Sequence, residues 1–207
     1  YSRQDNSTTF RVWAPLAEKV KLHLQDQNSA TKSSVAPEPI ALERANQGYW
    51  ITTVSNCSPG TRYLLSVDDG EPRPDPASRH QPEGVHAASA VVDSHFDWKT
   101  TNWNGRCLDE YVIYELHVGT FTRGGTFASA IDELPRLKKL GITAIEIMPI
   151  AQFPGTRNWG YDGVFPFAAA EAYGGLKGFQ EFVDAAHAHG MAVVLDVVYN
   201  HLGPEGN

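Results

Sequence analysis

The chain has 207 residues, 42% of them apolar, which suffices to bury the core of one large domain or of two modest ones. Its formal net charge is −7 and its Lys and Arg residues do not cluster, which argues against a nucleic-acid partner. Its apolar runs fall well short of the roughly 18 residues that a membrane-spanning helix requires, so no membrane partner is expected.

The first third of the chain contains short β-rich runs separated by turn residues. The runs cover residues 9–14, 19–24, 49–54 and 61–67, with turns at Pro15, Gly48, Pro59-Gly60 and Asp68-Asp69-Gly70. Val20, Leu22 and Leu24 alternate with other residues, the pattern of a strand with one buried face. This pattern predicts an all-β, immunoglobulin-like antiparallel sandwich over residues 1–95. The polar stretch 28–39 is predicted to form a long hairpin tip.

Residues 71–110 are poor in regular patterns and rich in proline. Prolines at 72, 74, 76 and 82 keep the backbone extended and remove hydrogen-bond donors that a sheet would need. We interpret this region as a strap, followed by a linker over residues 96–110 that leads into a second domain.

From Tyr111 onward the pattern alternates between strands and helices. Strands are predicted over residues 111–118, 142–150 and 191–198. The first helix should begin at Thr126, stop at Gly141 and kink at Pro135, with one stripe made of Phe127, Ile131, Leu134, Leu137 and Leu140. The second should end at Gly190, with a stripe made of Phe179, Phe182, Val183 and Ala186. Strands joined by helical crossovers predict a parallel sheet with right-handed connections.

The run from Met191 to Val197 is apolar except for Asp196, which predicts a strand buried on both faces. Asp196, Asn200 and His201 then fall at the C-terminal end of this strand, where an α/β barrel holds its active site. A closed barrel needs about eight strands. We therefore expect more of the protein to follow Asn207.

Two carboxylates on predicted strands, Glu146 and Asp196, could form the catalytic pair of a glycosidase, whose members stand about 5–9 Å apart. The alternative, which we favour for Glu146, is that its side chain faces a helix or forms a salt bridge. Asp196 lies nearer the C-terminal end of its strand, so it is the better candidate for a role in a site.

A loop rich in glycine and aromatic residues follows the second predicted strand, over residues 153–163. Its glycines can leave Trp159 and Tyr161 exposed, and an exposed aromatic face suits the apolar face of a pyranose ring. The alternative is an aromatic plug over the core. His117, at the end of the first strand, either donates a hydrogen bond at the same edge or serves a structural purpose only.

Residues 196–201 read Asp-Val-Val-Tyr-Asn-His, and residues 159–162 read Trp-Gly-Tyr-Asp. They resemble, respectively, the end of the third barrel strand and the loop of the sugar-stacking tyrosine in the alpha-amylase family of glycoside hydrolases. Residues 73–85, 158–163 and 200–207 are most similar to the branch of that family that releases trehalose from malto-oligosaccharides. The resemblance covers nearly the whole chain, and it implies that residues 111–207 are the βαβαβ start of a (β/α)8 TIM barrel.

The resemblance also implies roles for individual residues. Tyr161 would stack on the sugar ring just before the cleaved bond, and His201 would bind hydroxyls of that sugar. The remaining expected site residues are Trp159 and Asn200, which would contact substrate, and Asp196, Asp162 and His117, which would organise the site. The nucleophile, the general acid/base and a further stabilising Asp of the family lie on later strands. The 207 residues are therefore expected to hold no catalytic carboxylate and to be inactive alone.

The implied reaction is hydrolysis, with retention, of the α-1,4 bond next to the terminal trehalosyl unit of a malto-oligosaccharide. A branching or debranching enzyme acting on α-1,6 bonds is one alternative, and a non-catalytic α-glucan-binding protein is the other. No cofactor is expected, and the sequence contains no Gly-rich phosphate loop. In some relatives the asparagine matching Asn200 ligates calcium, but no second cluster of calcium ligands is found here, and His187 and His189 point in different directions, so no metal is expected. Cys57 and Cys107 are far apart in sequence, which favours reduced thiols and a cytoplasmic location.

Overall fold

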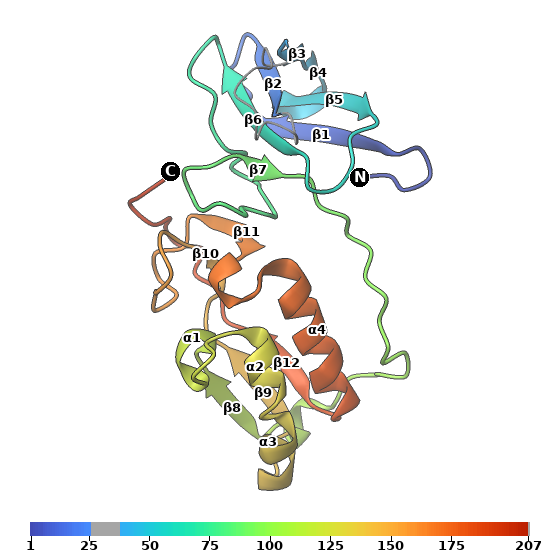
Figure 1. Ribbon diagram of the computed structural model, residues 1–207, viewed down its shortest axis with the longest axis vertical. Coiled ribbons are helices and arrows are strands. Elements are labelled where there is room, and N and C mark those ends of the chain that lie inside the picture. The colour runs from blue at the N-terminus through green and yellow to red at the C-terminus, as the bar shows by residue number, and fades with distance from the viewer. Residues whose placement is uncertain (26–37, 207) are drawn as a thin grey trace. The chain divides into compact units, whose positions relative to one another are not determined.

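The computed structural model describes residues 1–25 and 38–206. The chain divides into two compact units, Tyr1–Ser94 and His95–Asn207 (Figure 1). The hairpin tip predicted for residues 28–39 lies almost wholly outside the described residues.

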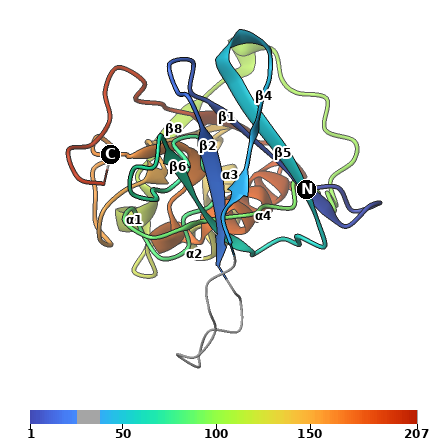
Figure 2. The ribbon, with the colours of Figure 1, turned by 90° about the horizontal axis from the view of Figure 1, so that it is seen from above.

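The first unit consists of two antiparallel sheets. One sheet has the order β1 (Ser7–Trp13), β5 (Tyr49–Ser55) and β4 (Glu43–Arg44). The other has the order β3 (Ile40–Ala41), β2 (Val20–Gln25), β6 (Arg62–Val67) and β7 (Ser89–Ala90). Figure 2 shows the strands of this unit from above. A short 3-10 turn, Asn46–Gly48, leads into β5.

Both sheets contribute side chains to one apolar core. Phe10 and Trp50 come from the first sheet, and Val20, Leu22 and Leu65 come from the second. Val20 is 1% exposed and Leu22 is fully buried, while Leu24 packs against the same cluster. The predicted sandwich and the predicted buried face of the 19–24 strand are therefore confirmed.

The strap after β6 is tied to the sandwich by hydrogen bonds around a buried carboxylate. The Tyr63 hydroxyl donates to Asp75 Oδ2 at 2.8 Å, and the Ser89 hydroxyl accepts from the Asp75 backbone N–H at 3.0 Å. Burial raises the pKa of the Asp75 carboxyl and that of the Tyr63 phenol. Arg73 and Leu65 also exchange backbone hydrogen bonds of 2.8 Å. These bonds satisfy the backbone of a segment that its prolines keep out of the sheets.

The second unit is built on the parallel sheet β12-β9-β8, in which the three strands are β12 (Ala192–Leu195), β9 (Ala144–Ile147) and β8 (Ile113–Leu116). Its helices are η2 (Leu108–Glu110), α1 (Val118–Phe121), α2 (Phe127–Ile131), α3 (Leu134–Leu140), η3 (Glu171–Tyr173) and α4 (Gly175–Ala188). The predicted order of parallel strands and crossover helices is confirmed.

The first predicted helix is interrupted rather than bent. Thr126 caps its start as predicted, accepting from the Ser129 N–H at 3.2 Å, and Gly141 ends it with φ 95°. Two residues in the αR region separate α2 from α3, and Pro135 occupies the first turn of α3, where a missing N–H costs least. The expected stripe holds except at Leu140, which is 66% exposed because it lies in the last turn before Gly141.

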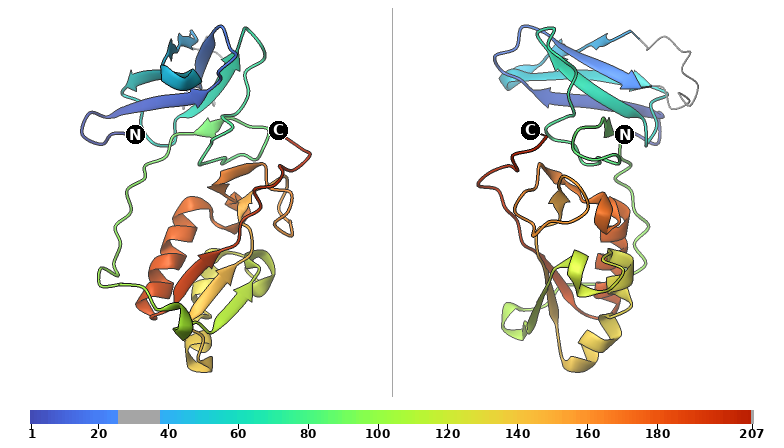
Figure 3. Two further views of the ribbon diagram at one scale, coloured as in Figure 1. Left: turned by 180° about the vertical axis from the view of Figure 1, so that it is seen from behind. Right: turned by 60° about the vertical axis from the view of Figure 1, so that its left-hand side comes forward.

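The helices cover one face of the sheet (Figure 3), and the core lies between them. Ile145 and Ile147 are fully buried in this core, together with Phe127 and Phe182. The prediction that the final strand is buried on both faces is wrong at its C-terminal end: Met191 is fully buried and Ala192 is 5% exposed, but Leu195 is 40% and Val197 is 42% exposed, although Leu195 pairs with the buried Ile147. Among the described residues β12 is an edge strand.

A hairpin that the sequence did not predict follows β9. Strands β10 (Ala151–Gln152) and β11 (Phe165–Ala169) pair antiparallel and enclose the loop 153–164. The short β10 and the register shift beside it explain why no alternation is visible in the sequence.

The linker into the second unit is anchored along α4. The Asp184 carboxylate accepts from the backbone N–H groups of Lys99 and Thr100, at 3.2 and 2.9 Å. Trp103 stacks on His187 with ring centroids 4.5 Å apart, and Arg106 Nε donates to the Gly190 carbonyl at 2.8 Å. Residues 99–106 are therefore held by contacts with Asp184 and His187 of α4 and with Gly190 just after it.

We expect Asp184→Ala to loosen this linker. Burial of the Asp184 carboxylate acts to raise its pKa, but the donors from Thr100 and Lys99 outweigh burial and lower it. A carboxylate whose pKa is lowered on folding stabilises the fold above its unfolded pKa and loses that effect as pH falls through the folded pKa. Hydrogen exchange at the Thr100 amide should report a loss of about 1.5–3 kcal/mol at neutral pH, and the difference from wild type should shrink on acidification.

The matched control is Glu181→Ala on the same helix, where the exposed carboxylate meets Lys177 at 3.8 Å. An exposed pair of this kind contributes about 0.3–0.5 kcal/mol, so Thr100 exchange should hardly change. Equal exchange rates in the two variants would contradict the anchoring role of Asp184.

Candidate functional site

The loop between β10 and β11 has a shape fixed by Asn158. The side-chain oxygen of Asn158 accepts from the Gly160 N–H at 2.5 Å, and its amide donates to Asp162 Oδ2 at 3.2 Å. Gly160 adopts φ 104°, and a Cβ there would lie 2.9 Å from the Pro149 ring. A residue with a side chain would therefore be strained at this position and crowd Pro149.

This shape leaves the two aromatic residues of the loop exposed. Trp159 is 69% exposed and Tyr161 is 53% exposed. The predicted exposure is confirmed, and the alternative of an aromatic plug over the core is wrong. Two flat aromatic faces beside polar groups can accept the apolar faces of sugar rings.

His117, directly after β8, contacts the backbone of this loop. Its Nε2 lies 2.6 Å from the Asn158 carbonyl oxygen, which can only accept, so Nε2 is the donor. The Tyr173 hydroxyl donates to the same carbonyl at 3.4 Å, and burial raises the pKa of this phenol. The His117 ring also meets Trp159 edge-on, with centroids 5.8 Å apart. His117 therefore holds the backbone beside Trp159, and its site-organising role remains a proposal.

A pocket of about 430 Å³ opens beside this cluster. It is lined by His117, Gly119, Thr120, Thr156, Arg157, Asn158, Trp159 and Tyr173. The exposed Trp159 ring and Arg157 both line this pocket, where they could contact a polyhydroxyl ligand. Arg157 was not singled out from the sequence, because nothing in its local pattern distinguishes it from a solvated loop residue.

The segment after β12 is fastened to the same loop. His201 Nε2 donates to the Tyr161 carbonyl at 2.9 Å, and the Gly203 N–H donates to the Gly163 carbonyl at 2.9 Å. A Cβ on Gly203 would overlap the Asp162 carbonyl oxygen. The structure therefore brings together Tyr161 and His201, the two residues expected to hold the sugar, although 40 residues separate them.

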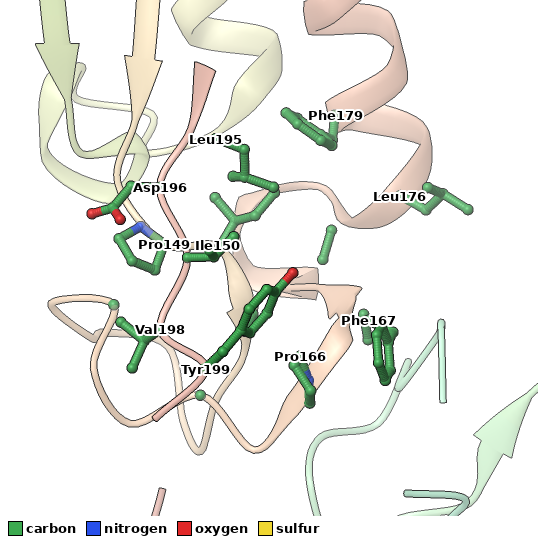
Figure 4. Close-up of a pocket in the computed structure, with 16 residues that line it drawn as sticks. Pro149, Ile150, Pro166, Phe167, Leu176, Phe179, Leu195, Asp196, Val198 and Tyr199 are labelled. Carbon is green, nitrogen blue, oxygen red and sulfur yellow. The ribbon is translucent and has the colours of Figure 1, made fainter. Parts of the chain in front are cut away.

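The remaining expected residues lie at the same edge of the sheet. The Asp196 N–H donates to the Ile147 carbonyl at 2.9 Å directly after β12, and the Asn200 side chain is exposed. Figure 4 shows a second pocket, of about 200 Å³, in which the Tyr199 ring lies near Ile150 and Pro166. The Asp196 carboxylate points away from the apolar residues Leu176 and Phe179 (Figure 4). Tyr199 was overlooked as a site residue, although it stands between Asp196 and Asn200.

Glu146 lies on the face of the sheet opposite the helices. Its neighbours Ile145 and Ile147 are fully buried in the core, so the alternation of a strand turns Glu146 the other way. It stands in register with Glu115 and Val194. The interpretation that Glu146 faces a helix is therefore wrong, and its carboxylate forms no salt bridge with a described residue. By the same alternation Asp196, two residues beyond Val194, shares this face.

Within residues 1–25 and 38–206, no group of three or more His, Cys, Asp or Glu side chains could hold a metal ion. None of the helices described there is both long and apolar enough to cross a membrane. Cys57 is buried, Cys107 is exposed, and both are free thiols.

Two family models together match nearly the whole chain. Residues 81–207 match the alpha amylase catalytic domain, and residues 1–79 match carbohydrate-binding module 48, the isoamylase N-terminal domain. A crystal structure of a Salmonella typhimurium protein named as an alpha amylase has a TM-score of 0.86 and 44% identity, covering 97% of this chain and 33% of that one. The pullulanase of Bacillus acidopullulyticus has a TM-score of 0.75 and 26% identity, covering 98% and 29%.

Curated relatives also include members of this family of enzymes, two of them at 46–48% identity. The malto-oligosyltrehalose trehalohydrolase of Saccharolobus solfataricus is 48% identical over 207 residues, which are 100% of this chain and 35% of that protein. The same enzyme of Rhizobium sp. strain M-11 is 46% identical over 96% of this chain and 33% of its own length. A 1,4-alpha-glucan branching enzyme of Pseudoalteromonas atlantica is 32% identical over 97% and 30%.

The chain thus spans about a third of the length of the trehalohydrolases that it matches. The parallel sheet with crossover helices, the aromatic loop after β9 and the polar segment after β12 all lie within the matched catalytic region. On this evidence the chain belongs to the alpha-amylase family of glycoside hydrolases.

Proposed function

We propose that the full-length protein hydrolyses the α-1,4 bond next to the terminal trehalosyl unit of maltooligosyltrehalose and releases trehalose. The observation that carries this proposal is the 48% identity to a malto-oligosyltrehalose trehalohydrolase over every residue of the chain. Its substrate is then a malto-oligosaccharide, and no nucleic acid or membrane takes part.

In this proposal residues 1–95 are an immunoglobulin-like sandwich domain, residues 96–110 a linker, and residues 111–207 the beginning of a (β/α)8 barrel. Support comes from the parallel order β12-β9-β8 with helices on one face, since a barrel places its helices outside. The face of the sheet opposite the helices, with Glu115, Glu146 and Val194, then looks into the barrel. The free thiols support the cytoplasm as the place of the reaction.

The site described above would form one wall of the sugar pocket. Tyr161 stacks on the ring before the cleaved bond, with Trp159 exposed two residues away. His201 uses Nε2 to hold the Tyr161 carbonyl, which leaves Nδ1 for a sugar hydroxyl. Asn200 is a further contact, and Asp196, Asp162 and His117 keep the two segments in position. These residues bind and orient the substrate, and they do not break the bond.

Bond cleavage in this proposal belongs to carboxylates outside the 207 residues. In a retaining glycosidase an acid protonates the leaving oxygen, a carboxylate forms a covalent glycosyl-enzyme, and water then releases the sugar. The 207 residues alone are therefore expected to be inactive.

Product analysis of the full-length protein tests the proposal. Incubation with maltooligosyltrehalose should release free trehalose and a shortened malto-oligosaccharide. A protein that releases no trehalose but makes or cleaves α-1,6 bonds in amylopectin would instead be a branching or debranching enzyme, the candidate favoured by the 32% identity to the branching enzyme.

A further inference from the structure

The linker contains the dipeptide Asn104-Gly105, in which Asn104 is the only asparagine of the chain that a glycine follows. Glycine has no Cβ, so nothing shields its backbone nitrogen from the side-chain amide of the residue before it. Both residues are exposed. A Cβ built on Gly105 would meet no atom within 4 Å apart from its chain neighbours, so a ring formed between these two residues has room.

Both groups that would form this ring are free of hydrogen bonds. Within residues 1–25 and 38–206, the Asn104 side-chain amide and the Gly105 N–H have no hydrogen-bond partner. The Gly70 N–H, which follows Asp69 in a turn, instead donates to the Val67 carbonyl at 2.8 Å. A nitrogen in such a bond must give up its acceptor before it can react, and the Gly105 nitrogen carries no such cost.

The dipeptide lies between two contacts that fasten the linker. The Trp103 ring stacks on that of His187 with the two planes 10° apart, and Arg106 Nε donates to the Gly190 carbonyl at 2.8 Å. Gly105 joins these contacts with φ 80°, a left-handed geometry that a side chain would strain. The path of the backbone between Trp103 and Arg106 is therefore specific, and a change in its length moves one contact relative to the other.

We propose that Asn104 is a site of spontaneous covalent modification, which converts it to isoaspartate and loosens the linker. The Gly105 backbone nitrogen loses its proton to solvent and attacks Cγ of Asn104. The new C–N bond closes a five-membered succinimide ring, and the side-chain nitrogen leaves as ammonia. Water then opens the ring at either carbonyl, so the products are aspartate and isoaspartate. Water is the only co-reactant, and nothing is oxidised or reduced.

The two products differ in what they do to the linker. Both carry a negative charge where the amide was neutral. Only isoaspartate also takes its Cβ into the backbone, which adds one atom to the path between Trp103 and Arg106. We expect the bond from Arg106 to the Gly190 carbonyl to weaken in the isoaspartate product and to persist in the aspartate product. The Tyr161–His201 contact takes no part, so the inference does not rest on the proposed function.

The test is ageing of the full-length protein in mildly alkaline buffer, followed by tryptic peptide mapping. Cleavage after Lys99 and Arg106 releases residues 100–106 as one peptide, which contains both Asn104 and Asn102. Asn102 is also exposed but precedes Trp103, so it is a control within the same molecule. Asn104 should gain one mass unit and give an isoaspartate fragmentation pattern, while Asn102 stays unchanged. Asn104→Gln, whose longer side chain cannot close a five-membered ring, should keep the original mass of the peptide.

Limited tryptic digestion of the native protein measures the loosening. The isoaspartate form should be cut after Arg106 about tenfold faster than the fresh protein, as the loss of one hydrogen bond from a charged group predicts. Freshly purified Asn104→Asp carries the charge without the extra atom and should be cut at the rate of the fresh wild type. The inference is overturned by no mass shift at Asn104, by an equal shift at Asn102, by unchanged cleavage of the isoaspartate form, or by equally fast cleavage of Asn104→Asp.

Discussion

Replacing His201 by alanine in the full-length protein is expected to lower kcat/KM for maltooligosyltrehalose about 100-fold. The substitution removes the 2.9 Å bond from Nε2 to the Tyr161 carbonyl, and with it the side chain proposed to hold a sugar hydroxyl. Both losses displace the sugar ring relative to the cleaving groups. Steady-state kinetics with a defined substrate measure the effect.

The matched control for His201 is His95→Ala. His95 is an exposed histidine directly before the linker, and its Nε2 lies 2.7 Å from Asp97 Oδ1. Its removal should change kcat/KM less than twofold, and both variants should melt close to the wild type. A His201→Ala protein with nearly wild-type kcat/KM would refute the proposed role of this residue.

Truncation of Phe127 is expected to have the largest effect on stability. Phe127 is fully buried, and its ring meets those of Phe179, Phe182 and Tyr173 at centroid distances of 5.3, 6.0 and 6.3 Å. Phe127→Ala removes these contacts and leaves a cavity between α2 and α4, so the free energy of unfolding should fall by about 3–5 kcal/mol. Urea unfolding of the full-length protein, followed through the transition of the unit that contains Phe127, measures it.

Phe167→Ala provides the comparison at equal chemistry. Phe167 is 61% exposed on β11, so the same truncation should cost less than about 0.5 kcal/mol. Similar losses in the two variants would mean that the core of the second unit is not centred on Phe127.

The order of strands and helices could be predicted because each element carries its own pattern. Thr126 and Gly141 mark the ends of a helical segment by their chemistry, and Val20, Leu22 and Leu24 mark a buried face by their spacing. Such signals are local, so no knowledge of distant residues is needed.

Burial of the final strand could not be predicted, because it depends on what lies beside the strand. The apolar run from Met191 to Val197 fits a strand covered on both faces, but Leu195 and Val197 at its end are exposed although they share the face of the buried Ile147. Hairpin β10–β11 escaped prediction for a related reason, since its pairing begins at a two-residue strand with a register shift.

In the candidate site, too, local features could be predicted from the sequence and contacts between distant residues could not. The exposure of Trp159 and Tyr161 followed from the glycines around them. The bonds from His201 to Tyr161 and from His117 to Asn158 span 40 and 41 residues, and no local pattern encodes them. These positions were expected from the resemblance to a family, and the fold brings them together by placing the loop after β9 beside the segment after β12 and the end of β8.

In the proposed function, residues 111–207 bind the sugar while carboxylates elsewhere in the full-length protein cleave it. A fluorinated glycosyl fluoride that traps the covalent intermediate of a retaining glycosidase tests this most directly. After digestion and mass spectrometry, the labelled carboxylate should lie on a peptide outside residues 1–207. A label on Glu146, on Asp196 or on any other carboxylate of residues 1–207 would contradict the account.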